Sequence, residues 1–210
     1  MKKGDFIWVG SLIAIILLLV VPSTHKVFIS ATASHPYFVG FLKFAILATM
    51  GELLAGRIVG GNYKKHNGLI AKACVWGFLG IVITLIFNIY AAGVIAAQGK
   101  GLLLSGAPIL FAFFTSAIMN LSFAPTMMAF HRFTDTFIDM KYEGKNPNIS
   151  SVAKTIDWDS FVSFVIVKTI PLFWIPAHTI TFLLPAEYRV LAAAFLSIAL
   201  GAILAFAKRK

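Results

Sequence analysis

The chain alternates long apolar stretches with short polar connections. Six apolar stretches, each near the roughly 20 residues that cross a bilayer, run over about 6–22, 37–60, 69–96, 103–130, 161–183 and 188–207. The third and fourth are long, which indicates tilt, a kink or extension beyond the membrane. Prolines inside the fourth and fifth free backbone carbonyls that neighbouring helices must satisfy. The pattern predicts an all-α, polytopic membrane bundle of about six transmembrane helices.

Composition supports this class of protein. The chain has 210 residues, of which 59% are hydrophobic and 12% charged, and a mean hydropathy of +0.88. A soluble domain carries about a quarter charged residues. We therefore expect one membrane domain over residues 35–210, preceded by an additional N-terminal transmembrane helix and an outer loop over residues 1–34.

Basic residues predict the orientation. The formal net charge is +10, but the basic residues lie in connections between apolar stretches, which indicates anionic lipid headgroups as partners and excludes nucleic acid. If the N-terminus is cytoplasmic, three basic residues face outward (Lys26, Lys100 and Arg189). Thirteen face inward: Lys2, Lys3, Arg57, Lys64, Lys65, Lys72, Arg132, Lys141, Lys145, Lys154, Lys208, Arg209 and Lys210. This asymmetry predicts that both termini are cytoplasmic, in a bacterial inner membrane or an organelle membrane.

Residues 131–160 form the one long connection. His131, Asp135 and Asp139 recur every four residues with aromatic residues on another face, which predicts an amphipathic helix along the inner interface. The same spacing is feasible for metal ligands, so a membrane-surface enzyme is one alternative. A solvated helix face is the simpler interpretation. We therefore expect no metal, no cofactor and no enzyme activity.

Small residues mark the faces on which helices pack. Ala193, Ser197, Gly201 and Ala205 recur at every fourth position of the last stretch. Such a stripe lets helix backbones approach closely. It could serve the bundle or a homo-oligomer equally well.

Ionisable and amide groups inside apolar stretches are the first place to look for function. At 1.5 Å per residue, Glu52, Asn120 and Lys168 lie about 10 to 15 Å from the inner ends of their stretches, in one layer. We predict a Glu52–Lys168 ion pair with Asn120 nearby. A weaker outer layer contains Lys43, Asn88 and His178, of which Lys43 is close enough to the interface to snorkel.

Two interpretations of these layers stay open. In the first, they line a water-filled path of a channel or transporter-like protein for small solutes. In the second, the Glu52–Lys168 pair only fixes helix register in a structural or lipid-organising protein with a dry core.

Several motifs carry a family resemblance. These are Gly51-Glu52, the Phe123-Ala124-Pro125 segment, Pro171 with Trp174, and the run Leu184-Pro185-Ala186-Glu187-Tyr188-Arg189. With them, residues from about 35 to 207 resemble the family of the 22-kilodalton peroxisomal membrane protein and the Mpv mitochondrial inner-membrane protein, as a divergent member. The last run is the most specific, since it is close to the family's Val-Pro-x-x-Tyr-Arg. The resemblance implies a small helical membrane protein, sometimes described as a non-selective channel, without a cofactor.

Overall fold

The computed structural model describes residues 2–63 and 68–207, and these form helices and their connections. The helices are α1 (Lys3–Val20), α2 (Pro22–Ser34), α3 (Pro36–Gly60), α4 (Leu69–Gly99), α5 (Pro108–Ser122), α6 (Ala124–Tyr142), α7 (Ile149–Thr155), α8 (Trp158–Ser160), η1 (Phe161–Trp174), α9 (Ile175–Leu183) and α10 (Ala186–Ala207). The part of the chain so described contains no strand, which confirms the all-α fold class. Five of the predicted basic residues (Lys64, Lys65, Lys208, Arg209 and Lys210) lie outside the described residues.

The long helices match the six apolar stretches. Five described helical segments are long and apolar enough to cross a membrane, including the continuous segment from Trp158 to Leu183. The sixth is α5 followed by α6, which meet at a bend of 47°. The bend lies where Pro125 enters the first turn of α6, and a proline at that position cannot continue the hydrogen-bonding of the preceding helix.

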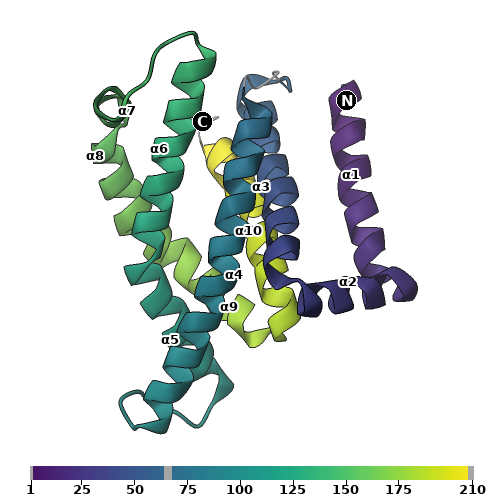
Figure 1. The fold of residues 1–210 in the computed structure, drawn as a ribbon, viewed down its shortest axis with the longest axis vertical. Coiled ribbons are helices and arrows are strands. Elements are labelled where there is room, and N and C mark those ends of the chain that lie inside the picture. The colour runs from purple at the N-terminus through teal and green to yellow at the C-terminus, as the bar shows by residue number, and fades with distance from the viewer. Residues whose placement is uncertain (1, 64–67, 208–210) are drawn as a thin grey trace.

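The chain passes up and down the bundle. Figure 1 places the start of α1, the α6–α7 connection and the end of α10 at one end, here called the upper end. The α4–α5 connection and the α9–α10 turn lie at the opposite, lower end. Both described ends of the chain therefore lie at the same end of the bundle.

The predicted outer loop is mostly helix. Residues Pro22–Ser34 form α2, which lies across the lower end in Figure 1. The loop expectation was wrong because this segment is too polar to stand out as apolar, while Pro22 is well placed at a helix N-terminus. The N-terminal unit is fastened to the bundle by side chains: Trp8 Nε1 donates to the Met50 carbonyl at 2.9 Å, and Asp5 pairs with Arg57 at 2.8 Å.

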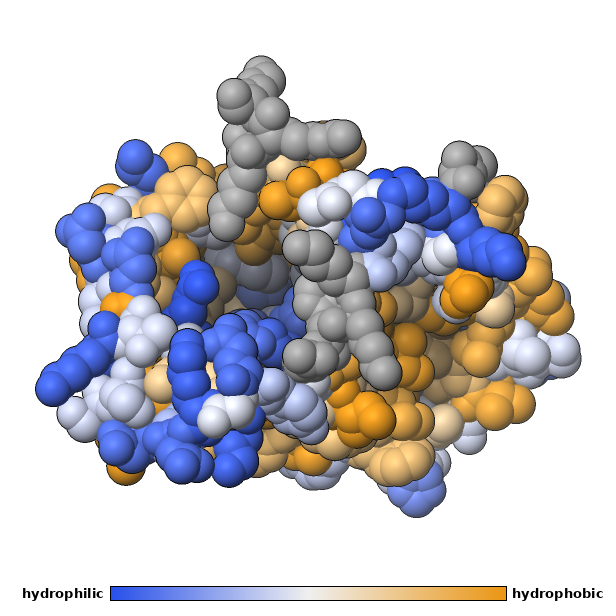
Figure 2. Space-filling model, turned by 90° about the horizontal axis from the view of Figure 1, so that it is seen from above, coloured by the Kyte–Doolittle hydropathy of each residue, from blue (hydrophilic) through white to orange (hydrophobic). Residues whose placement is uncertain are grey.

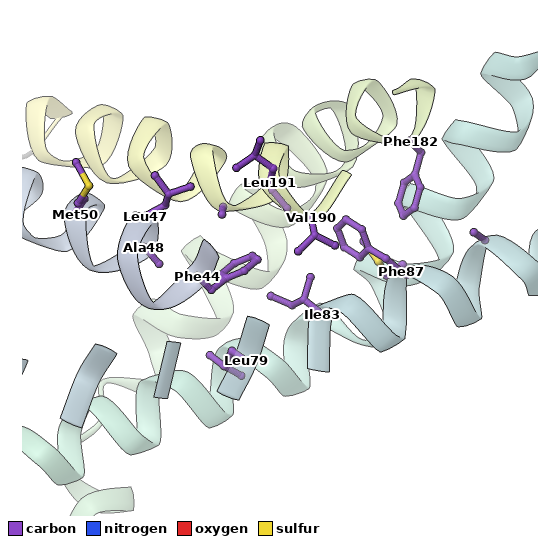
Figure 3. Close-up of a cluster of buried hydrophobic side chains, with 14 of the residues drawn as sticks. Phe44, Leu47, Ala48, Met50, Leu79, Ile83, Phe87, Phe182, Val190 and Leu191 are labelled. Carbon is purple, nitrogen blue, oxygen red and sulfur yellow. The ribbon is translucent and has the colours of Figure 1, made fainter. Parts of the chain in front are cut away.

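Helices α3, α4 and α10 pack closely around a shared core. Figure 3 shows buried side chains from α3, α4, α9 and α10 that meet there, among them Phe44, Leu79 and Val190. Two glycine pairs permit the contact. A Cβ on Gly80 of α4 would overlap the backbone of Gly40 on α3. A Cβ on Gly201 would lie 3.1 Å from the Gly51 carbonyl oxygen, so the stripe on α10 faces α3.

The predicted interfacial helix takes another course. Residues 131–142 continue α6 up the bundle beside α4, instead of lying along its end. The chain then turns at Glu143–Gly144 and forms the short helix α7 before it re-enters the bundle at α8. The amphipathic pattern was correct, but its polar face pairs with α4, as described below.

Candidate functional site

A cavity of about 320 Å³ runs down the centre of the bundle. Its walls come from α3, α4, α5, α6, η1, α9 and α10. On α10 the lining extends from Ala193 to Leu204, which at 1.5 Å per residue is roughly 16 Å along the helix axis. Figure 2, which looks onto the upper end, shows a hollow bordered by hydrophilic residues. The exposed Arg132 lines the cavity at this end.

A carboxylate lies in the upper part of the α3 wall, where the lining runs from Phe44 to Ala55. Glu52 of α3 accepts a hydrogen bond from Trp76 Nε1 of α4 at 2.7 Å. His131 Nε2 of α6 lies 3.7 Å from the same carboxylate oxygen, and the His131 ring packs on the Trp76 ring with centroids 4.2 Å apart. The Glu52 side chain keeps 28% of its surface exposed. The Glu52 carboxylate therefore lines the cavity and is partly exposed to it.

An amide–imidazole pair forms the cavity floor. Asn120 of α5 and His178 of α9 are both buried, and the Asn120 side-chain nitrogen lies 3.0 Å from His178 Nδ1. The Asn120 amide also donates to the Ser116 carbonyl at 2.9 Å. Trp174 stacks on the His178 ring at 5.1 Å, and its indole nitrogen is buried without a hydrogen-bond partner among the described residues. The floor is thus polar but enclosed.

Aromatic side chains close the lower end. Phe182 packs between Phe87, at 5.0 Å between centroids, and Phe111, at 6.4 Å. The Arg189 guanidinium lies over both Phe111 and Phe182, at 5.6 and 5.5 Å, and donates to the Leu184 carbonyl at 2.9 Å. Phe87, which lines the cavity, thus packs against the aromatic rings at the lower end.

Three of the six predicted polar residues line this cavity: Glu52, Asn120 and His178. Asn120 was predicted in an inner layer with Glu52 and Lys168, and His178 in an outer layer. The direct contact between Asn120 and His178 shows that this division into two layers was wrong.

The predicted Glu52–Lys168 ion pair was wrong. Lys168 is exposed on the outside of η1, whereas the next two residues, Thr169 and Ile170, are buried. Counting residues gives depth in the membrane but no direction around the helix. In addition, η1 has unusually long π-helical winding around Pro171, which changes the set of positions that share a face.

The other two predicted polar residues lie elsewhere. Lys43 is buried, and its ammonium lies 4.7 Å over the Phe28 ring and 3.2 Å from Thr32 Oγ1, which it reaches as a donor. It thus packs against α2. Asn88 is exposed and donates to the Thr84 carbonyl of its own helix at 2.8 Å. Neither side chain lines the cavity.

The polar face of α6 is paired with a lysine. Lys72 Nζ of α4 lies 2.9 Å from Asp135 and 2.8 Å from Asp139. His131 points to Glu52 instead. In the part of the chain that the structure describes, no group of three potential ligands could hold a metal ion. The spacing that made a metal site feasible therefore serves helix packing.

The motif residues behind the family resemblance have structural positions. Pro171 lies inside η1, Trp174 lines the cavity, and Pro185 lies in the turn between α9 and α10. Tyr188 Oη is 2.9 Å from His25 Nε2 of α2. Of these residues and Arg189, Trp174 alone lines the cavity.

Sequence reasoning missed Trp76 and the role of His131. Tryptophans of membrane proteins are enriched at the ends of the spans, whereas Trp76 lies inside an apolar span. This unusual position could have indicated that the Trp76 indole donates a hydrogen bond to a buried acid. Comparisons with protein-family models, curated proteins and solved structures give no match to this chain.

Proposed function

We propose that this protein is an integral membrane channel or transporter-like protein for small solutes, with a path that starts in the central cavity. One observation carries the proposal: Glu52, Asn120 and His178, from three different helices, line a single cavity that is open at one end. Polar groups in an apolar bundle are costly unless they serve packing or a path. Here the Glu52 side chain, although it accepts a hydrogen bond from Trp76, keeps part of its surface exposed and lines the cavity.

The surface supports placement in a membrane. Large hydrophobic side chains are exposed along the long helices, for example Phe6 at 63%, Leu172 at 77% and Phe206 at 56%. A soluble monomer rarely exposes so much contiguous apolar surface. With the excess of basic residues at the upper end, we place that end and both termini on the cytoplasmic side.

The structural alternative is less well supported. A dry core with a direct Glu52–Lys168 pair was its expected signature, and the two residues do not pair. The membrane-enzyme alternative loses its acidic face to Lys72. The likeness to the Mpv and 22-kilodalton peroxisomal family remains a proposal that agrees with a channel.

The packing of Phe182 against Phe87 and Phe111 at the lower end allows a test of the proposed path. Phe182→Ala removes the ring between Phe87 and Phe111, so it should raise solute flux or conductance of the purified protein in proteoliposomes. Phe164→Ala is the matched control, because Phe164 is exposed on the outside of η1. Phe182→Leu, which keeps more of the volume, covers the case in which the alanine variant does not fold.

Two outcomes would overturn the proposal. The first is that the wild type and both Phe182 variants, all folded by circular dichroism, give no flux above empty liposomes. The second is that Phe164→Ala raises flux as much as Phe182→Ala, because the increase would then reflect general loosening of the bundle.

A further inference from the structure

Among the described residues, the basic partner of Glu52 is the imidazole of His131, although the chain is rich in lysine and arginine. The nearest bases along its own and the adjacent helix are committed elsewhere. Arg57, five residues further along α3, pairs with Asp5 at 2.8 Å. Lys72, one turn before Trp76 on α4, pairs with Asp135 and Asp139. Among the described residues, no lysine or arginine forms an ion pair with Glu52.

The remaining neighbours of Glu52 are weak or neutral. Trp76 contributes one indole N–H. His131 Nε2, at 3.7 Å, is too far for a hydrogen bond and carries a full charge only when protonated. The exposed Arg132 lies at the cavity mouth, where solvent and salt screen it. A carboxylate in an apolar layer with such weak partners carries a desolvation penalty. A positively charged ligand would offset this penalty.

Most of the other lining residues are apolar, and they are rich in aromatic rings and thioethers. These residues include Phe44, Phe123, Met127, Phe161 and Trp174. Aromatic faces attract organic cations electrostatically, and methionine adapts to irregular ligands. An inorganic divalent ion such as Ca²⁺ prefers six to eight oxygen ligands. The two carboxylates of the lining do not supply them, since Asp135 is paired with Lys72. A volume of about 320 Å³ falls within the range of small-molecule pockets, about 300–1,000 Å³.

We infer that the cavity binds an organic monocation with an apolar body, with its charge at Glu52 and its body against the aromatic lining. This inference deepens the proposed function and rests on it for transport; binding alone requires only the cavity. The solute class is then a lipophilic amine or quaternary ammonium compound. The Asn120–His178 floor limits how deeply it enters.

Equilibrium binding in detergent micelles tests the inference without any need for flux. The probe is benzyltrimethylammonium, which has a permanent charge; neopentylbenzene is its neutral isostere and phenylacetate an anion of similar size. Isothermal titration calorimetry should show saturable, 1:1 binding of the cation and much weaker binding of the other two. Equal binding of cation and neutral isostere would overturn the inference.

Variants separate the charge from the fold. Glu52→Gln keeps an acceptor for Trp76 but loses the charge, so it should weaken cation binding roughly 30-fold or more, as expected for one partner of a desolvated charge pair. Glu52→Asp should recover part of the affinity. Glu187→Gln is the matched control, because Glu187 lies at the start of α10, away from the cavity lining. Unchanged affinity in Glu52→Gln, with the protein folded, contradicts the inference.

The flux experiment and the binding experiment can be distinguished by their outcomes. Saturable cation binding without flux in proteoliposomes supports this inference and counts against transport. Flux of neutral solutes together with absent cation binding supports transport and overturns the organic-cation assignment.

Discussion

The contact of Lys72 with α6 should contribute measurably to stability. Its ammonium lies 2.9 and 2.8 Å from two carboxylates, and its side chain is 10% exposed. Lys72→Met keeps most of the length of the side chain but removes both ion pairs. It also leaves Asp135 and Asp139, four residues apart on one helix, to repel each other. Helix α6 would lose its main polar contact with α4.

The expected cost lies between two limits. Exposed ion pairs contribute about 0.2–1 kcal/mol, whereas removal of one partner from a fully buried pair costs about 3–5 kcal/mol. Here Asp135 is 29% and Asp139 50% exposed. We therefore expect a loss of about 2 kcal/mol in the free energy of unfolding for Lys72→Met. Neutralising both acids as well (Asp135→Asn with Asp139→Asn) should restore about 1 kcal/mol of it.

Reversible unfolding by sodium dodecyl sulfate in mixed micelles, followed by circular dichroism, measures these differences. Lys145→Met is the matched control, because its pair with Glu143 at 2.6 Å is more than half exposed and should contribute less than about 0.5 kcal/mol. The reasoning is refuted if Lys72→Met also costs less than about 0.5 kcal/mol. It is equally refuted if the loss is undiminished when both acids are neutral.

Three further changes test the packing. Asn120→Leu leaves His178 Nδ1 buried without its partner and should cost about 1–3 kcal/mol in the same unfolding assay, while Asn120→Leu combined with His178→Phe should cost less than the sum of the two single changes. Gly80→Val places a side chain on the backbone of Gly40 and should cost about 1–3 kcal/mol or more through overpacking, seen as a lower melting temperature in detergent. Trp8→Phe removes the hydrogen bond from α1 to α3 and should cost about 1 kcal/mol, with faster limited proteolysis before α3 as the readout.

The approximate limits of the long helices could be predicted because a long apolar stretch is a property of local sequence. Each predicted stretch corresponds to a helix, or to a pair such as α5 and α6 that meet at one bend. The small-residue stripe was predicted correctly as a packing face, and Gly201 indeed lies against Gly51. Such features depend on composition and period, both of which are visible in one chain.

The site could be predicted only in part because its geometry depends on the direction in which each side chain points. Residue counting selected Glu52, Asn120 and His178, which line one cavity, but it separated Asn120 from His178 and placed Lys168 beside Glu52. The π-helical winding of η1 turns Lys168 outward, and no residue count reveals such winding. Lys72 was treated only as a marker of orientation, because the arrangement of α4 beside α6 is a tertiary fact.

The charge pattern of the chain acquires a second meaning when the ion pairs are known. The formal net charge of +10 first indicates membrane orientation. Yet no lysine or arginine in the described part of the chain pairs with Glu52, because Arg57 anchors α1 through Asp5 and Lys72 anchors α6 through two acids. A chain that needed only helix register could satisfy Glu52 with any of these bases. The ion pairs of Lys72 hold α6 in the cavity wall, and the ion pair of Arg57 holds α1 against α3. The contacts that stabilise the bundle therefore also leave the Glu52 carboxylate available to a ligand.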